Sequence, residues 1–264
     1  MTERNHIYFF HNEPSDAKIT ALLQLAEKYH FQMVPDPKDA NIIISIGGDG
    51  TFLQAVRKTN FRQDCLYAGI TVQNELGLYC DFYLNHVSSI IDAITQEKIE
   101  VRRYPVLKAS IDGQGSFYCL NEFSIRSGII KTFEMDVFID DIHFETFRGD
   151  GMLIATPTGS TAYNKSVGGA VVDPLLPCLQ VSEIASLNNF KYRTLGSSFI
   201  LDGSRKLTLK VAGKGNEYPL MGMDNEALSI RHVDRVEVTL SDKMIKTVKL
   251  KDNSFWEKVK RTFL

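Results

Sequence analysis

Three glycines, Gly47, Gly48 and Gly50, stand between a continuous apolar run and an amphipathic segment. The apolar run at 41–46 has the character of a strand buried on both faces, and the sequence after Thr51 is typical of a helix. Glycines let the backbone turn sharply and approach a ligand closely, and the first N–H groups of a helix attract an anion. This segment therefore predicts an α/β unit with a phosphate-binding turn at the end of a strand.

Asp49 lies among these glycines, where a carboxylate would repel a bound phosphate. Its presence makes chemical sense if it accepts a proton or meets a metal ion carried by a nucleotide. The loop matches neither the Walker sequence nor the dinucleotide fingerprint GxGxxG, whose third glycine is missing. The alternative interpretation is a tight turn in which Asp49 caps a helix that starts at Thr51.

Residues 1–100 alternate between short apolar runs and helical stripes. Runs at 7–10, 41–46 and 66–70 predict strands. Apolar residues at helical spacing predict helices at 19–29, with Ser15 as cap, after Thr51, and at 87–94. This alternation predicts a doubly wound, Rossmann-like parallel sheet in an α/β domain at 1–100.

Beyond Pro105 the apolar residues recur at every second position, in the segments 107–111, 135–139, 207–211 and 236–240. Breaks at 112–115 and 213–215 contain glycine or aspartate and are typical of turns between antiparallel strands. Residues 101–250 are therefore expected to form an all-β sandwich.

The segment 251–264 contains Ser254 followed by Glu257, the pattern of a capping box. A short helix is expected to dock back on the body of the protein through one side, formed by Phe255, Trp256, Val259 and Phe263. A basic helix lying on a membrane surface is less favoured, because the segment carries few charges.

The charges are nearly balanced, with 30 Lys and Arg against 32 Asp and Glu. Nucleic acid and anionic membranes are therefore not expected as partners. The first residues are charged where a signal peptide would be apolar, and no run approaches the ~18 apolar residues of a membrane span, so we expect a cytoplasmic protein. The four cysteines and six histidines are too scattered for a metal knuckle or an HExxH pair, which predicts reduced core thiols and no protein-built metal site.

Two further polar clusters follow predicted strands. Residues 156–163, TPTGSTAY, surround one glycine with hydroxyl groups that could hold sugar hydroxyls and phosphates. Asn121 and Glu122 follow the apolar run 117–120, and an amide beside a carboxylate can hold a ribose diol or an adenine amine. The alternatives are a plain surface loop and ordinary surface polar groups.

Taken together, these residues resemble the NAD kinase family, which phosphorylates the 2′-hydroxyl of the adenosine ribose of NAD to make NADP. GGDGT at 47–51 looks like the first motif of the family, the Asn121, Glu122 pair like the second, and TPTGSTAYNKS from Thr156 like the third. GGDGT is shared with diacylglycerol- and sphingosine-type lipid kinases, whereas its combination with the third motif is much more specific. The resemblance covers nearly the whole chain.

The resemblance implies that Asp49 accepts the proton of the attacking hydroxyl and that Gly50 lies against the dinucleotide. The other NAD-binding residues that it implies are Asn121, Glu122, Arg148, Asp150, Thr161, Ala162, Tyr163, Asn164, Lys165, Ser166, Ala185, Asp224 and Asn225. It also implies ATP or polyphosphate as the donor, a divalent ion (Mg²⁺) carried by the nucleotide, and a homodimer or homotetramer. The chain departs from the family at 73–81, where Glu75 and Leu78 replace a small residue and an aromatic.

Phosphoryl transfer depends on alignment and on neutralisation of charge, so a base, a glycine-rich cradle and a nucleotide-borne Mg²⁺ suffice. Two other functions are weighed against an NAD kinase. A soluble lipid kinase would need an apolar or strongly basic surface, which the sequence does not indicate. A nucleotide-sensing module would not need Asp49 among the glycines, because a neutral residue would bind phosphate better.

Overall fold

The computed structural model describes residues 5–11, 17–73, 76–86, 90, 92–93, 96–212 and 218–264. The chain divides into two compact units, Met1–Tyr104 with Met244–Leu264, and Pro105–Lys243. These bounds differ from the predicted domains because residues 244–250 group with the first unit. Two long strands, β6 (Ile99–Ile111) and β17 (Arg235–Leu250), each begin in one unit and end in the other.

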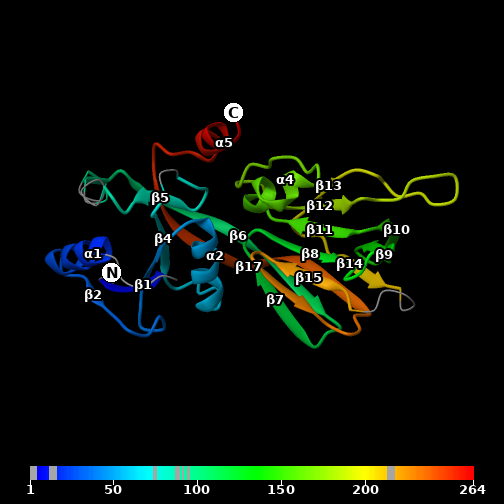
Figure 1. The fold of residues 1–264 in the computed structure, drawn as a ribbon, viewed down its shortest axis with the longest axis horizontal. Helices are drawn as coiled ribbons and strands as arrows, with labels where there is room; N and C mark the ends of the chain where they lie inside the picture. Colours follow the sequence, from blue (N-terminus) through cyan, green and yellow to red (C-terminus); the bar gives the residue numbers. More distant parts are fainter. Residues whose placement is uncertain are drawn as a thin grey trace. The chain divides into compact units, whose positions relative to one another are not determined.

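The first unit is built on a parallel sheet (Figure 1). Its strands, in spatial order, are β2 (Gln32–Met33), β1 (His6–His11), β3 (Ile42–Ile46), β4 (Leu66–Thr71) and β5 (Cys80–Tyr83). The end of β17 also pairs with β4, in parallel, at Thr247. The predicted class of sheet is thus confirmed.

Helices cover both faces of this sheet. From α1 (Ala17–Lys28), Leu22 packs in one core cluster with Ile46 and Ile70. From α2 (Asp49–Lys58), Phe52 faces Tyr67, with 6.1 Å between the ring centroids. Because side chains alternate along a strand, Tyr67 and Ile70 of β4 lie on opposite faces. The helices α1 and α2 therefore pack on opposite faces of the sheet, which is the doubly wound arrangement.

Some predictions fall outside the described residues. These are the cap at Ser15, the side chain of Ile19, most of the helix at 87–94 and the turn at 213–215. Of the predicted helix, Ile90, Asp92 and Ala93 are described and are helical.

The second unit is a sandwich of two sheets with antiparallel pairings, as predicted. The first sheet contains β17, β6 and β7 (Gly115–Cys119), together with β9 (Phe133–Ile139), β10 (Ile142–Gly149) and β14 (Leu207–Val211). The other contains, in order, β13 (Phe199–Asp202), β12 (Cys178–Ile184), β11 (Gly151–Ala155), β8 (Glu122–Arg126), β15 (Leu220–Met223) and β16 (Glu226–Ser229).

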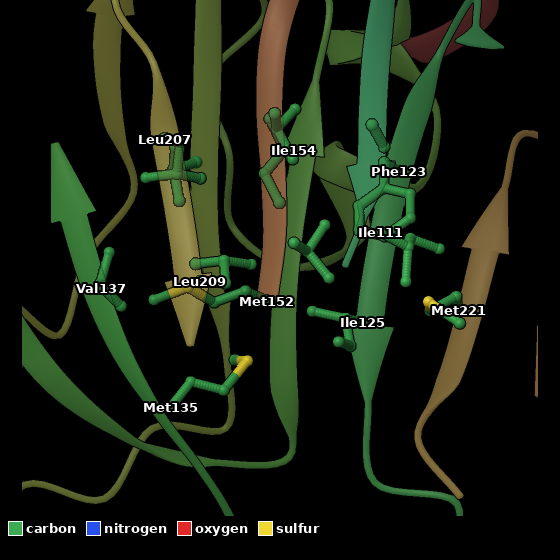
Figure 2. Close-up of a cluster of buried hydrophobic side chains, with 14 of the residues drawn as sticks. Ile111, Phe123, Ile125, Met135, Val137, Met152, Ile154, Leu207, Leu209 and Met221 are labelled. Atoms are coloured by element: carbon green, nitrogen blue, oxygen red, sulfur yellow. The ribbon is translucent and has the colours of Figure 1, made fainter. Parts of the chain in front are cut away.

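The core of this unit lies between its two sheets. Figure 2 shows Val137, Leu207 and Leu209 of the first sheet gathered with Ile125 and Met152 of the second. Burial of such side chains, each contributing about 1.5–3 kcal/mol, is the main force that holds the sheets together. After β11 come a short 3₁₀ helix, η1 (Thr158–Thr161), and α4 (Tyr163–Ser166).

The last helix, α5 (Phe255–Phe263), begins after Ser254, whose hydroxyl accepts a hydrogen bond from the Glu257 backbone N–H at 3.1 Å. The predicted cap is therefore confirmed. The predicted docking side is wrong in part: Trp256 is 50% exposed and Phe263 39%, whereas Phe255 and Lys258 are buried. The helix is turned in this way because Lys258 makes buried polar contacts, described below.

All four cysteines are buried and none is in a disulfide, as predicted for reduced core thiols. In the part of the chain that the structure describes, no helix combines the length and the apolar character that crossing a membrane requires.

Candidate functional site

The glycine-rich loop joins β3 to α2, as predicted. The helix begins at Asp49, with Gly48 as N-cap and no side-chain cap. The alternative in which Asp49 caps a helix from Thr51 is therefore wrong, because Asp49 is itself in the first turn. Gly47 has a φ of +151°, and a Cβ there would overlap the Thr51 side chain, so this position requires glycine. A Cβ at Gly50 would meet nothing within 4 Å.

The Asp49 carboxylate binds a second loop of the same unit. Its Oδ2 accepts a hydrogen bond from the Leu78 N–H at 2.6 Å, and its Oδ1 accepts one from the Tyr79 N–H at 2.9 Å. Gly77 permits this approach, since a Cβ there would overlap the carboxylate. The ring of Tyr79 stacks on Phe52 of α2, with 4.8 Å between centroids. These contacts fix the orientation of the carboxylate.

Two buried lysines contact the other side of this loop. Lys249 of β17 donates from Nζ to the carbonyl oxygens of Tyr79 at 2.7 Å and Leu78 at 2.9 Å. Lys258 of α5 donates to the same Leu78 oxygen at 2.8 Å and to the Asp81 carboxylate. Asp81 and both lysines were not among the functional residues predicted from the sequence. One available signal was that Lys249 continues the alternating, buried face of β17 after Ile245 and Thr247.

The two lysines and Asp81 shift one another's pKa values. Burial, together with the charge of Lys249, lowers the pKa of Lys258 to about 7. Although burial opposes ionisation of Asp81, Lys249 and Lys258 hold the pKa of that carboxyl below its ordinary value. Asp81 is therefore the ionised anchor of the cluster.

In the second unit, the hydroxyl-rich loop lies against the start of β8. The Leu120 carbonyl oxygen accepts hydrogen bonds from the hydroxyls of Thr156 at 2.7 Å and Thr158 at 3.2 Å. The Thr156 N–H donates to the Asn121 carbonyl at 2.8 Å. Gly159 is so close to Asn121 that a Cβ would overlap its backbone. Two clusters predicted from separate segments are therefore neighbours.

A hairpin turn supports the same segment. Asp224 and Asn225 connect β15 to β16, where Met223 pairs with Glu226. Asp224 has a φ of +52°, a left-handed conformation that aspartate tolerates in such turns. Its carboxylate accepts hydrogen bonds from the N–H groups of the three consecutive residues Leu120, Asn121 and Glu122, at 3.0, 2.7 and 3.2 Å. Asp224 thus fixes the backbone of the predicted second motif.

Glu122 is a buried carboxyl whose Oε2 has no hydrogen-bond partner. Burial, with a contribution from the Asp224 charge, raises the pKa of Glu122 to about 8. The side chain is therefore mostly protonated near neutral pH, and it can donate as well as accept a hydrogen bond. The described protein groups supply no hydrogen-bond partner for this buried oxygen.

Glu122→Gln is expected to change how stability depends on pH. Where the folded pKa of an acid is raised, the folded protein keeps a proton that the unfolded chain loses, so the free energy of unfolding falls as pH rises from about 4.5 to about 8. Glutamine is a neutral group of similar size, so the variant should lose less stability across this window. Urea denaturation at several pH values measures the difference, with the exposed Glu226→Gln as control. Parallel pH profiles for wild type and Glu122→Gln would contradict the raised pKa.

The residues that follow Gly159 have different surroundings. Thr161, Ala162 and Tyr163 are half-buried, and Lys165 and Ser166 are exposed. Asn164 is fully buried. Its amide donates to the carbonyl oxygens of Ser160 and Ala170, each at 3.3 Å, and its oxygen accepts from Ser182 at 2.8 Å. The side chain of Asn164 therefore stabilises the loop itself.

Arg148, Asp150 and Ala185 do not join the cluster around Asn121. Gly151, at the start of β11, pairs with Ile184, whereas Ala155, at its end, pairs with Glu122. A five-residue strand at about 3.4 Å per residue separates its two ends by about 14 Å. Arg148 is itself engaged, since it donates to Glu134 at 2.7 Å and lies 4.4 Å from the centre of the Tyr192 ring.

The comparisons with known proteins decide the family. The model of the ATP-NAD kinase C-terminal domain matches residues 120–250. NAD kinase 2 of Bacillus subtilis is 65% identical over 264 residues, which cover 99% of each chain. The chain belongs to the NAD kinase family. NAD kinase 2 of Bacillus cereus (strain ATCC 14579) is 59% identical over 267 residues, covering 100% of each chain.

Solved structures of NAD kinases share the fold. Yeast NADH kinase, crystallised with NADH, superposes with a TM-score of 0.80 at 18% identity, covering 98% of this chain and 87% of that one. An NAD kinase from Archaeoglobus fulgidus in complex with ATP gives a TM-score of 0.76 at 21% identity, covering 97% and 98%. The resemblance to NAD kinases inferred from the three motifs is therefore confirmed.

The departure from the NAD kinase pattern at 73–81 falls on the loop that contacts Asp49. Glu75 lies outside the described residues. Leu78 binds Asp49 and the lysines through its backbone N–H and carbonyl, so replacing the aromatic of the family by leucine removes none of these hydrogen bonds.

Proposed function

We propose that this protein is an NAD kinase, which transfers a phosphoryl group from ATP or polyphosphate to the 2′-hydroxyl of the adenosine ribose of NAD and so produces NADP. The observation that carries the proposal is the 65% identity to an NAD kinase over essentially the full length of both chains. A glycine-rich loop with a rigidly oriented aspartate supports the same chemistry.

In this reaction Asp49 is the proton acceptor. The 2′-oxygen attacks the terminal phosphorus, a new P–O bond forms, and the bond to the leaving ADP or shortened polyphosphate breaks. The hydroxyl proton passes to the Asp49 carboxylate and then to solvent. Each carboxylate oxygen accepts one backbone N–H and retains a lone pair for the substrate hydroxyl. The two backbone bonds therefore orient the base without saturating it.

The NAD-binding residues are assigned in two groups. Asn121, Glu122, the residues at 161–166 and the Asp224, Asn225 turn form one group, supported by the hydrogen bonds of Asp224 and by the unpartnered oxygen of Glu122. Arg148, Asp150 and Ala185 form the second, at the other end of β11, and would contact a different part of the dinucleotide. Gly50 is assigned to the dinucleotide as well, because the space on the side where a Cβ would point is unfilled within 4 Å.

A Mg²⁺ ion would arrive with the phosphoryl donor. The described residues contain no cluster of three or more His, Cys, Asp or Glu side chains suited to a metal ion. An ion carried by a nucleotide is coordinated chiefly by phosphate oxygens and water. When bound, the ion neutralises charge on the transferred group. A cytoplasmic location remains a prediction, with which four buried thiols outside any disulfide agree.

The test is NADP formation by the purified protein from NAD, Mg²⁺ and either ATP or polyphosphate, detected with an NADP-specific dehydrogenase. NADP with one or both donors is the expected result and identifies the donor. Absence of NADP with both donors, while calorimetry still detects NAD binding, would favour the nucleotide-sensing module. Phosphorylation of diacylglycerol instead of NAD would favour the lipid kinase.

We also expect the protein to be a homodimer or homotetramer. Apolar side chains are exposed on the edge strand β10 of the second unit, where Ile142 is 73% and Phe144 41% accessible. The Phe144 ring lies 5.3 Å from that of Phe199 on β13. Light scattering after gel filtration should give a molar mass that is a multiple of the 29.8 kDa of one chain. Phe144→Glu should lower this molar mass, because a charge on the apolar edge weakens pairing between subunits. A monomeric wild type, or an equal effect of the control Trp256→Glu, would contradict this surface.

A further inference from the structure

We propose that Lys258, on the C-terminal helix α5, is a positioning residue for Asp49, which it orients through the peptide group between Leu78 and Tyr79. The proposal rests on the proposed kinase function, in which Asp49 accepts the proton of the substrate hydroxyl. It gives α5 a role in the reaction that none of the three motifs indicates.

The geometry of one peptide group carries the argument. Its carbonyl oxygen, that of Leu78, accepts hydrogen bonds from Nζ of Lys258 at 2.8 Å and from Nζ of Lys249 at 2.9 Å. Its N–H, that of Tyr79, donates to Asp49 Oδ1 at 2.9 Å. The peptide group is planar and conjugated, so an amino group that donates to the oxygen, charged or neutral, makes the N–H a stronger donor, and a charged one does so most. The lysines therefore strengthen the bond that orients the carboxylate.

The two lysine amino groups lie between two carboxylates, that of Asp81 and that of Asp49. Asp81 Oδ1 accepts from both lysines, and its Oδ2 accepts from the Leu250 N–H at 2.8 Å. One carboxylate thus faces two amino groups inside the cluster, and Asp49 is the second carboxylate, one peptide group away. The side chains of Lys249 and Asp81 are fully inaccessible and that of Lys258 is 2% accessible, so solvent screens these interactions little.

Attachment of the helix alone does not account for this cluster. Removing charged groups from water is costly, and well-packed apolar side chains often hold elements together at least as well as a buried ion pair. Phe255 of α5 is already buried and can supply such packing. What the lysine adds is direction, because its amino group contacts the Leu78 carbonyl, which shares a peptide group with the Tyr79 N–H, one of the two backbone donors to Asp49.

The test compares Lys258→Met with Lys260→Met. Methionine keeps much of the length and apolar bulk of lysine but cannot donate a hydrogen bond. Lys260 is exposed on the same helix and serves as the control. Lys258→Met should lower kcat for NADP formation by about 10- to 100-fold, because small displacements of a catalytic group have effects of this order. The KM for NAD should stay within about twofold, because no NAD contact is assigned to this loop.

A second readout is independent of activity. In NMR spectra, the Tyr79 amide proton should move upfield and exchange faster with solvent in Lys258→Met but not in Lys260→Met, since its bond to Asp49 weakens. If Lys258→Met fails to fold, Lys258→Leu replaces it under the same criteria, because leucine also cannot donate a hydrogen bond. Wild-type kcat, an equal loss in Lys260→Met, or an unchanged Tyr79 amide would overturn the positioning role while leaving the kinase intact. A wild-type protein that makes no NADP would overturn the kinase function itself.

Discussion

Asp49→Asn is expected to lower kcat for NADP formation by about 10²- to 10⁴-fold, the usual contribution of a general base. An amide cannot accept the proton of the 2′-hydroxyl. NAD should still bind, because most of its assigned contacts lie in the second unit. Steady-state NADP formation and calorimetric titration with NAD measure the two quantities separately. Wild-type turnover in this variant would refute the role of Asp49.

The same substitution should also weaken the loop at Leu78 and Tyr79. The carboxylate accepts one N–H on each oxygen, whereas asparagine has a single acceptor and would turn its NH₂ group toward one of the two donors. An unsatisfied donor of this kind costs about 1–3 kcal/mol of unfolding free energy.

Gly77→Ala separates the loss of the base from the displacement of the loop. It keeps the carboxylate but adds a Cβ that would overlap it. Lost turnover in both variants would show that the orientation of the carboxylate matters as well as its presence. Normal turnover in Gly77→Ala would show that the hydrogen bonds to the loop are not needed for catalysis.

Gly159→Ala is expected to disrupt the proposed NAD-binding region of the second unit. The added Cβ would overlap the backbone of Asn121, which cannot move freely: its N–H donates to Asp224 at 2.7 Å and its carbonyl accepts from Thr156 at 2.8 Å. Overpacking of this kind costs about 1–3 kcal/mol. If about 1.4 kcal/mol of this cost arises only in the NAD-bound protein, the affinity for NAD decreases about tenfold.

Calorimetry with NAD and thermal unfolding test this prediction. Gly115→Ala, in β7, is the matched control, because a Cβ there meets nothing within 4 Å. Unchanged NAD affinity in Gly159→Ala would show that the contact between the hydroxyl-rich loop and Asn121 does not shape the binding site.

Features set by neighbouring residues were predictable. The apolar runs at 41–46 and 66–70 identified parallel strands, and the alternation after Pro105 identified the sandwich. Ser254 identified the start of α5, because a cap is made by residues three positions apart. The glycines at 47–50 located the turn that holds Asp49, since their conformations depend on the local backbone.

Features set by contacts between distant residues were not predictable. Lys258 and Leu78 are 180 positions apart, and neither has a local pattern that names the other. Likewise, strand pairing across β11 placed Arg148 and Asp150 away from Glu122, although all three were assigned to NAD.

The sequence by itself thus determined the helices and strands with clear periodicity, the class of each sheet and the family, because periodicity and short motifs are local properties of the chain. The tertiary structure alone decided the partners of Asp49, the protonated state of Glu122 and the burial of Lys258. These depend on which surfaces meet and how much water they exclude, and local periodicity carries no record of either.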